Sequence, residues 1–164
     1  MKYEVIFETE RIKFIKVNEN YVDEYLKMIN DEEVQMFISK KRFNLTYEQE
    51  LEWVRENKTN NNLFTMIEKH TNDFIGNIEI MEIHDGIGEL GIAITKDKQN
   101  MHYGQEAINK IKDYAFNELN LDGLELNVYA TNPRGIRCYE RAGFIAAGKG
   151  KDEDDIHMIL PRIK

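Results

Sequence analysis

The feature that most constrains the fold of this chain is a long amphipathic segment, residues 103–119. Its apolar residues recur at the three- and four-residue spacing of one helix face. The segments on either side, residues 87–95 and 124–130, have the length and patterning of strands. Because a strand–helix–strand connection is almost always a right-handed parallel crossover, the sequence predicts a parallel strand pair within a sheet.

The other predicted elements indicate a mostly antiparallel arrangement. Asp85-Gly86 is typical of a hairpin turn, and Thr46 with Gln49 predicts a capped helix start. Gly143 is expected to close a short helix in a left-handed conformation. The remaining predicted strands are residues 11–17, 63–68, 74–83, 144–148 and 156–160, and the remaining helices are residues 21–29, 46–54 and 132–142. The fold class predicted from these elements is α+β.

Length and composition favour a single domain spanning residues 1–164. The chain is 41% hydrophobic and 32% charged, which is typical of a globular protein. No apolar run approaches the roughly 20 residues that cross a bilayer, and residues 1–4 do not begin an apolar export signal. Cys138 is the only cysteine, which excludes an internal disulfide and a multi-cysteine zinc site. We therefore expect a cytoplasmic protein with no membrane partner.

The net charge of the chain indicates which kinds of charged partner it can bind. Thirty acidic and 22 basic side chains give a formal net charge of −8. A negative field opposes binding to a phosphate backbone, so nucleic acid is not expected as a partner. The same field favours a cationic partner by steering, although a soluble surface accounts for the charge without any partner.

A polar loop precedes the long helix and includes Gln99-Asn100-Met101-His102-Tyr103-Gly104. The free N–H groups and the positive dipole end of a helix start suit a phosphate or pyrophosphate. Any loop between a strand and a helix has such amides, however, and neither a dinucleotide fingerprint nor a Walker loop is present. On its own, the loop is compatible with an anion site or with an ordinary connection.

A second segment, residues 132–144, contains the short helix. Asn132 suits the N-cap and Pro133 suits the first helical position, which explains both residues structurally. Tyr139 lies about two turns beyond Asn132, so both project from one helix face. A tyrosine at this position fits core packing as well as catalysis, and Cys138 fits a small packing residue better than a nucleophile.

Together the two segments resemble the GCN5-related N-acetyltransferase superfamily. The phosphate loop of that superfamily, Q/R-x-x-G-x-G/A, matches at Gln99 and Gly104. Its later motif, N-x-x-S/A/G-x-x-x-Y-x-x-x-G-F, matches at Asn132, Gly135, Tyr139, Gly143 and Phe144. The resemblance covers roughly residues 10–160, and among subgroups it is strongest to ribosomal-protein and polyamine N-acetyltransferases. It implies a three-layer α/β/α fold with about four helices, whose mixed, mostly antiparallel sheet contains a splayed parallel strand pair.

The resemblance also implies a reaction and a cofactor. It implies acetyl-CoA as the acyl donor and an amine that attacks the thioester directly. Tyr139 is implied as the acid that protonates the leaving thiolate. The residues implied to bind the cofactor are Ile92, Ala93, Ile94, Gln99, Asn100, Met101, His102, Tyr103, Gly104, Gln105, Asn132 and Arg137.

One residue departs from the family pattern. His102 occupies a position that is usually glycine, where positive φ lets the backbone approach phosphate. We expect the histidine to adopt the left-handed conformation at some cost and to offer a ring N–H to the pyrophosphate. The alternative is a loop that binds coenzyme A poorly.

An amine must lose a proton before it attacks, and a carboxylate is the usual base. Glu79, Glu82 and Glu89 lie on predicted central strands, and Glu79 and Glu82 face opposite sides unless a bulge intervenes. Related N-terminal acetyltransferases place a glutamate where this chain has Asn127. We predict Glu89 as the base, although each of these residues also fits an ordinary solvated carboxylate.

The acceptor itself is not named by the sequence. In polyamine acetyltransferases, carboxylates that match Glu82 and Glu89 line the acceptor region, and Glu33 belongs to an acidic cluster that suits a cationic amine. The open alternatives are a polyamine or other small amine, a ribosomal-protein N-terminus, and a non-catalytic acyl-CoA-binding module. The oligomeric state is also left open, with a homodimer among the options.

Overall fold

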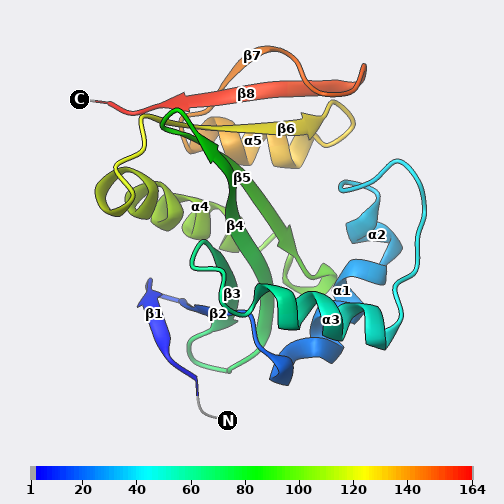
Figure 1. Cartoon of the computed structure of the whole chain (residues 1–164). Coiled ribbons are helices and arrows are strands. Elements are labelled where there is room, and N and C mark those ends of the chain that lie inside the picture. The colour runs from blue at the N-terminus through cyan, green and yellow to red at the C-terminus, as the bar shows by residue number, and fades with distance from the viewer. Residues whose placement is uncertain (1–2, 164) are drawn as a thin grey trace. The chain divides into compact units, whose positions relative to one another are not determined.

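A computed structural model describes residues 3–163. Met1 and Lys2, which begin the segment used to argue against an export signal, lie outside the described residues. The chain divides into two compact units, one of residues 1–79 and 92–103 (unit 1) and one of residues 80–91 and 104–164 (unit 2). Figure 1 labels the elements, whose hydrogen-bonded strand order is β1-β2-β3-β4-β5-β6-β8-β7. Within residues 3–163, no helix combines the length and the apolar character that crossing a membrane requires.

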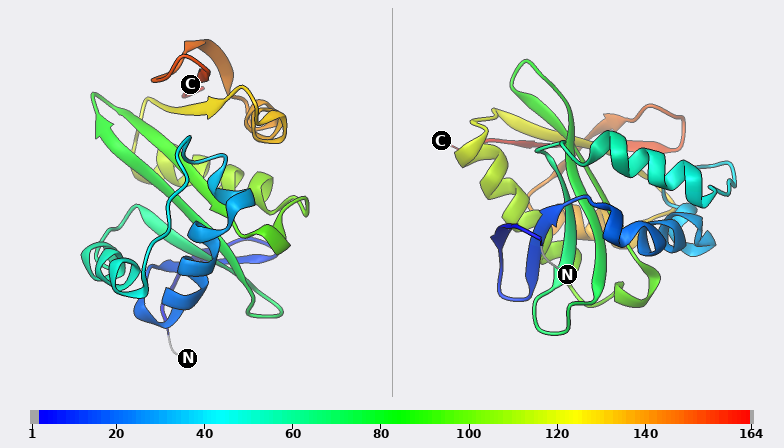
Figure 2. Two further views of the ribbon diagram at one scale, coloured as in Figure 1. Left: turned by 90° about the vertical axis from the view of Figure 1, so that its right-hand side faces the viewer. Right: turned by 60° about the horizontal axis from the view of Figure 1, so that its bottom comes forward.

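Unit 1 is a set of antiparallel strands with helices, all of which except η2 come before the third strand in sequence. The strands are β1 (Val5–Glu8), β2 (Ile12–Lys16), β3 (Leu63–Glu68) and the first part of β4 (Phe74–His84), with the end of β5 (Ile87–Ile94). The helices are η1 (Glu19–Tyr21), α1 (Val22–Asn30), α2 (Glu32–Gln35), α3 (Tyr47–Asn57) and η2 (Lys96–Lys98). α1 and α3 lie side by side (Figures 1 and 2).

The core of unit 1 follows from strand alternation. Ile15 on β2 and Leu63 and Ile67 on β3 point to one face, where they pack in one cluster with residues of α1 and α3. Tyr25 of α1 is fully buried there and meets Trp53 edge-on, with the ring centroids 5.8 Å apart. The predicted capping box is present, because Thr46 and Gln49 each bond the other's backbone N–H at the start of α3.

Unit 2 contains the predicted parallel crossover. Its elements are the end of β4, the start of β5, α4 (Tyr103–Asp113, from Gly104 on), η3 (Tyr114–Glu118), β6 (Gly123–Tyr129), α5 (Pro133–Arg141), β7 (Ile145–Lys149) and β8 (Asp155–Pro161). β5 and β6 pair in parallel through three residue pairs that end at Glu89 and Glu125. β8 then pairs antiparallel with both β6 and β7. The mixed α/β fold with one parallel pair is therefore confirmed.

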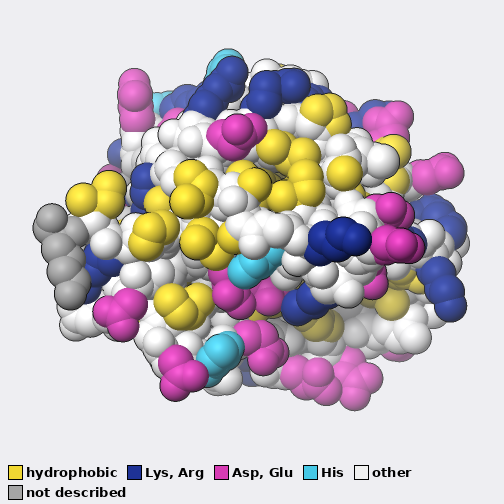
Figure 3. Space-filling model, turned by 90° about the horizontal axis from the view of Figure 1, so that it is seen from above, with side chains coloured by type: hydrophobic (Ala, Val, Ile, Leu, Met, Phe, Trp, Pro, Cys, Tyr) yellow, Lys and Arg dark blue, Asp and Glu magenta, His cyan; other side chains and the backbone are white. Residues whose placement is uncertain are grey.

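In unit 2, β6 has a buried apolar face, whereas β7 is exposed to solvent. Leu124, Leu126 and Val128 alternate along β6 as buried residues, and Lys112 of α4 donates a hydrogen bond to Ala142 O at the end of α5. β7 is exposed along its whole length, and Ile145 is 57% exposed. On the face seen in Figure 3, hydrophobic side chains gather near the centre while acidic and basic side chains are interspersed around them.

Three details of the fold differ from the prediction. The helix predicted for residues 103–119 changes at Asp113 into a π-helical turn, in which Leu119 N–H bonds Tyr114 O at 3.0 Å. A π turn adds one residue to a single turn, which an apolar stripe does not reveal. β1 and α2 were not predicted, because segments of four residues are too short to show a period.

Two glycines behave as their positions require. Gly143 has φ +106 and ends α5 in the predicted left-handed conformation. Gly76 of β4 lies against the β5 backbone, where a Cβ atom would be only 2.0 Å from Ala93 O. No side chain fits at Gly76, so this close approach of the two strands depends on glycine.

Candidate functional site

The segment between β5 and α4, residues 96–102, is the candidate anion site, and we call it the phosphate loop. It begins with the short helix η2, and Gln99 Nε2 donates back to Ile94 O at 3.0 Å. Asn100 and His102 have φ of 63° and 65°. The predicted left-handed conformation of His102 is therefore confirmed, and a second left-handed residue, Asn100, was not predicted. Both side chains are exposed.

The start of α4 supplies donors next to this loop. The first residues of an α-helix have N–H groups with no intrahelical acceptor, and here these belong to Tyr103, Gly104 and Gln105. Oxygen atoms of a diphosphate fit such donors, and the helix dipole favours the negative charge. Gln105 Oε1 is buried without a hydrogen-bond partner in the described part of the chain. This oxygen needs an N–H or O–H donor, and coenzyme A carries both kinds.

The end of β5 contains the three residues implied to hold the pantetheine arm. Ile92, Ala93 and Ile94 are partly exposed, and Ile94 O already accepts from Gln99. Thr95 N–H, the next amide, bonds Ile75 O on β4 at 2.9 Å. These two hydrogen bonds fix the backbone at the end of β5, directly before the phosphate loop begins.

In unit 2, α5 presents the residues of the second motif. Asn132 Oδ1 accepts from Gly135 N–H at 3.0 Å, as an N-cap does. A Cβ atom at Gly135 would lie 2.5 Å from Asn132 Nδ2, so a larger residue there would require the Asn132 side chain to shift. Arg137, which the resemblance implied as a cofactor residue, is exposed on the same helix.

Tyr139 is partly buried and is positioned by the end of α5. Its ring packs edge-on against Phe144 with centroids 6.0 Å apart, and its carbonyl accepts from Phe144 N–H. Burial raises the pKa of the Tyr139 hydroxyl above its usual value, so the phenolate form is even less accessible than in a free tyrosine. Within residues 3–163, no hydrogen-bond partner is found for this hydroxyl. Burial also raises the pKa of the Cys138 thiol, which supports a packing role for Cys138.

The predicted acceptor carboxylates lie in different surroundings. Glu89 Oε1 lies 3.2 Å from Lys151 Nζ, and the Glu89 side chain is 17% exposed. Glu82 is exposed and has φ 47, so strict alternation along β4 does not hold there. In unit 1, Glu79 is partly buried, and Glu33 Oε2 forms an ion pair with Lys96 Nζ at 3.2 Å.

Sequence reasoning missed a polar group on one sheet face of unit 2. His157 Nε2 lies 3.5 Å from Glu125 Oε2. Glu125 is in register with Glu89, and Asn127 is in register with His157, so all four point to one face. The polar alternation of Glu125 and Asn127 along a predicted strand was the available indication. The alternation could not show that His157 lies beside Glu125, because that depends on the pairing of β8 with β6.

Three comparisons with known proteins place this geometry in context. The family model described as "Acetyltransferase (GNAT) domain" matches residues 11–145. A spermidine N(1)-acetyltransferase of Vibrio cholerae is 32% identical over 85 residues, which are 51% of this chain and 49% of that relative, so the match spans about half of its length. The acetyltransferase PseH of Campylobacter jejuni is 24% identical over 85% of this chain and 86% of that relative.

Solved structures show the same fold. A GNAT-family acetyltransferase from Bacillus anthracis superposes with a TM-score of 0.83 at 20% identity and covers 98% of both chains. The spermidine N-acetyltransferase of Vibrio cholerae, solved with CoA and spermine, superposes with a TM-score of 0.81 at 20% identity, covering 93% of this chain and 96% of that one.

Proposed function

Because the chain belongs to the acetyltransferase (GNAT) domain family, we propose that it transfers an acetyl group from acetyl-CoA to a primary amine of a small cationic molecule such as a polyamine. Acetyl-CoA is the acyl donor of this family. The observation that carries the proposal is the family match over residues 11–145. Because that match runs through both units, the proposal treats residues 1–164 as one acetyltransferase domain.

The phosphate loop and the start of α4 are assigned the diphosphate of the cofactor. The N–H groups of Tyr103, Gly104 and Gln105 donate to its oxygens, and the exposed His102 imidazole is assigned an N–H donor for the same group. This assignment is supported by the family match and by the positive φ of His102, which takes the backbone conformation that glycine usually provides.

The remaining cofactor residues keep the roles that the resemblance implied. Backbone groups of Ile92, Ala93 and Ile94 are assigned to the pantetheine arm, and Asn132 and Arg137 of α5 are assigned to the cofactor. Tyr139 is the acid, because a tyrosine hydroxyl, with a reference pKa of about 10, carries a proton at neutral pH that it can give to the leaving thiolate.

Glu89 remains the proposed base for the ammonium of the acceptor. A lysine-like amine has a reference pKa of about 10.4, so it arrives protonated at neutral pH. Lys151 competes for the Glu89 carboxylate in the absence of an acceptor, and an incoming ammonium would take the place of Lys151. Glu82 and Glu33 are proposed to attract the acceptor by charge rather than to react.

The polyamine class of acceptor is supported by two observations. The Vibrio cholerae relative is named for spermidine acetylation. The net charge of −8 also favours the approach of a polycation. The two other candidates, a ribosomal-protein N-terminus and a non-catalytic acyl-CoA-binding role, serve as outcomes of the test.

The test combines binding with turnover. Calorimetry with acetyl-CoA measures cofactor binding, and thiol release is followed with spermidine, spermine, putrescine and a ribosomal-protein N-terminal peptide. We expect binding and release with the polyamines. Binding without release from any amine would indicate a non-catalytic module, release with the peptide alone would indicate a protein acceptor, and no binding at millimolar acetyl-CoA would refute the enzyme.

A further inference from the structure

We propose that Arg11, Glu68 and Tyr103 are positioning residues that hold the phosphate loop in the conformation that binds diphosphate. This inference rests on the proposed function, because that proposal assigns the loop its ligand. All three residues belong to unit 1. None of the three is a residue that carried the resemblance, although Tyr103 lies within the loop motif at a position the motif does not specify.

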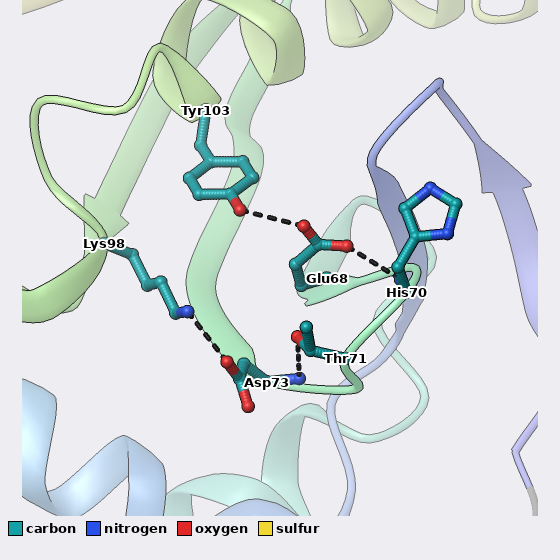
Figure 4. Close-up of polar contacts among 6 residues, drawn as sticks. All are labelled: Glu68, His70, Thr71, Asp73, Lys98 and Tyr103. Carbon is teal, nitrogen blue, oxygen red and sulfur yellow. Dashed lines mark hydrogen bonds and ion pairs between the residues drawn. The ribbon is translucent and has the colours of Figure 1, made fainter.

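The first contact joins the start of α4 to the end of β3. Tyr103 is 6% exposed, and its hydroxyl donates to Glu68 Oε2 at 3.0 Å (Figure 4). Glu68 is 8% exposed, and its other oxygen, Oε1, accepts from His70 N–H at 2.7 Å. The His70 amide lowers the pKa of Glu68, and the Tyr103 hydroxyl adds to that effect. The carboxylate therefore stays ionised and holds the phenol in one direction.

The second contact comes from Arg11, which precedes β2. Its guanidinium carbon lies 4.2 Å from the centroid of the Tyr103 ring, within the range of a cation–π contact. Its Nη1 also donates to Met101 O at 3.0 Å. Arg11 therefore contacts the residues immediately before and after His102.

These contacts explain how the strained loop is maintained. A histidine in the left-handed region is unfavourable and persists where its surroundings fix it. Met101 and Tyr103, its two neighbours in the chain, are each held by Arg11, and Tyr103 is also held by Glu68. His102 itself is exposed, so its conformation is imposed from both sides rather than by its own packing.

The other end of the loop is fixed on the same β3–β4 turn. Lys98 Nζ lies 2.8 Å from Asp73 Oδ2, and Asp73 N–H donates to Thr71 Oγ1 (Figure 4). The Asp73 pair is exposed, and such pairs are individually weak. The buried contact at Tyr103 therefore contributes most. One end of the loop is held by Glu68 at the end of β3, and the other by Asp73 in the turn that follows.

A loop that is held in advance binds its ligand without an ordering cost. Loosening it should weaken acetyl-CoA binding while leaving the chemical step unchanged, because none of the three residues is assigned to the reacting atoms. This separates a positioning role from general stability, since a less stable but correctly folded enzyme has an unchanged KM.

The experiment measures the Kd of acetyl-CoA by calorimetry and both KM and kcat by thiol release. Tyr103→Phe keeps the ring and removes the hydroxyl, and Arg11→Met removes both Arg11 contacts. We expect each to raise Kd and KM for acetyl-CoA by about tenfold, the usual size for a hydrogen bond to a charged group, with kcat within about twofold. Glu68→Ala should behave similarly.

Two matched variants serve as controls. Glu68→Gln can still accept from His70 and can donate to Tyr103, so it should restore binding to within about twofold of the unmodified enzyme. Lys69→Met breaks the exposed ion pair of Lys69 with Glu8, 2.9 Å long, on the same turn without touching the loop, and it should change nothing.

The outcomes distinguish this inference from the proposed function. If the unmodified protein binds acetyl-CoA and Tyr103→Phe binds it equally well, the positioning role is wrong and the function stands. If the unmodified protein does not bind acetyl-CoA, the proposed function fails and the loop loses its ligand. If Glu68→Ala fails to fold, Tyr103→Phe and Glu68→Gln still decide the question, because neither changes side-chain volume appreciably.

Discussion

At the residue scale, the candidate site depends on side chains whose surroundings change their chemistry or their backbone. Tyr139 is an ordinary tyrosine in sequence, but burial on α5 raises the pKa of its hydroxyl, so the phenol stays neutral over a wider pH range than a free tyrosine. His102 is a polar residue in a polar loop, yet its φ of 65° puts it where glycine is the common residue. Both properties depend on neighbours, and each leads to a test.

Replacing Tyr139 with phenylalanine should lower kcat for amine acetylation by about a hundredfold or more, the usual contribution of a general acid. The ring and its contact with Phe144 remain, so the Kd of acetyl-CoA should change little. Initial rates of thiol release measure kcat, and calorimetry measures the Kd of acetyl-CoA. An unchanged kcat would remove Tyr139 from the acid role.

Replacing His102 with glycine should keep or improve the affinity for acetyl-CoA. Glycine adopts positive φ freely, so roughly 1 kcal/mol of backbone strain is relieved. The readouts are the Kd of acetyl-CoA and the midpoint of thermal unfolding, which should rise. A large loss of affinity would contradict this expectation and would show that the imidazole contributes more to binding the diphosphate than its backbone conformation costs.

At the element scale, the fold was predictable where segments are long and periodic. The strand–helix–strand crossover of β5, α4 and β6 follows from the apolar stripe of residues 103–119, and the parallel pairing of Ile87–Glu89 confirms it. Elements that rest on tertiary contacts were not predictable. β1 and α2 are four residues each, and the π turn after Asp113 leaves no periodic trace.

The close approach of β4 and β5 gives a prediction at this scale. Gly76→Ala would place a Cβ atom 2.0 Å from Ala93 O, so the strands must separate. We expect a loss of about 2 kcal/mol or more in the free energy of unfolding, measured by urea denaturation. Gly148→Ala is the control, since no atom lies within 4 Å of that position and only its backbone φ of +117° is unfavourable. Equal losses at both sites would contradict the close approach as the cause.

At the scale of the whole molecule, the net charge of −8 acts on any charged ligand. Two partners of opposite charge meet faster at low ionic strength, and salt at 0.1 M screens this attraction beyond about 10 Å. The polyamine proposal therefore carries a clear dependence on ionic strength.

We expect kcat/KM for spermidine to fall several-fold as salt is raised from about 0.02 M to 0.3 M. The KM for acetyl-CoA, an anion, should not rise in parallel, because screening reduces its repulsion from the same field. The measurement is initial rates at fixed pH with one substrate saturating. A neutral amine of similar size is the control, and an equal fall for both amines would refute steering by charge.

The sequence by itself determined the fold class, the acetyltransferase family and the positions of the two motifs. These depend on local spacing: an apolar stripe, a capping asparagine and a tyrosine two turns later on the same helix face. Only the tertiary structure decided which distant residues meet. Arg11 and Tyr103 are 92 positions apart in the sequence, and Glu68 lies between them. Glu89 and Lys151 are 62 positions apart and Glu125 and His157 are 32 apart, yet each pair is in contact in the folded chain. Such contacts arise when strands pair and a loop folds back, and no periodicity within one segment records them.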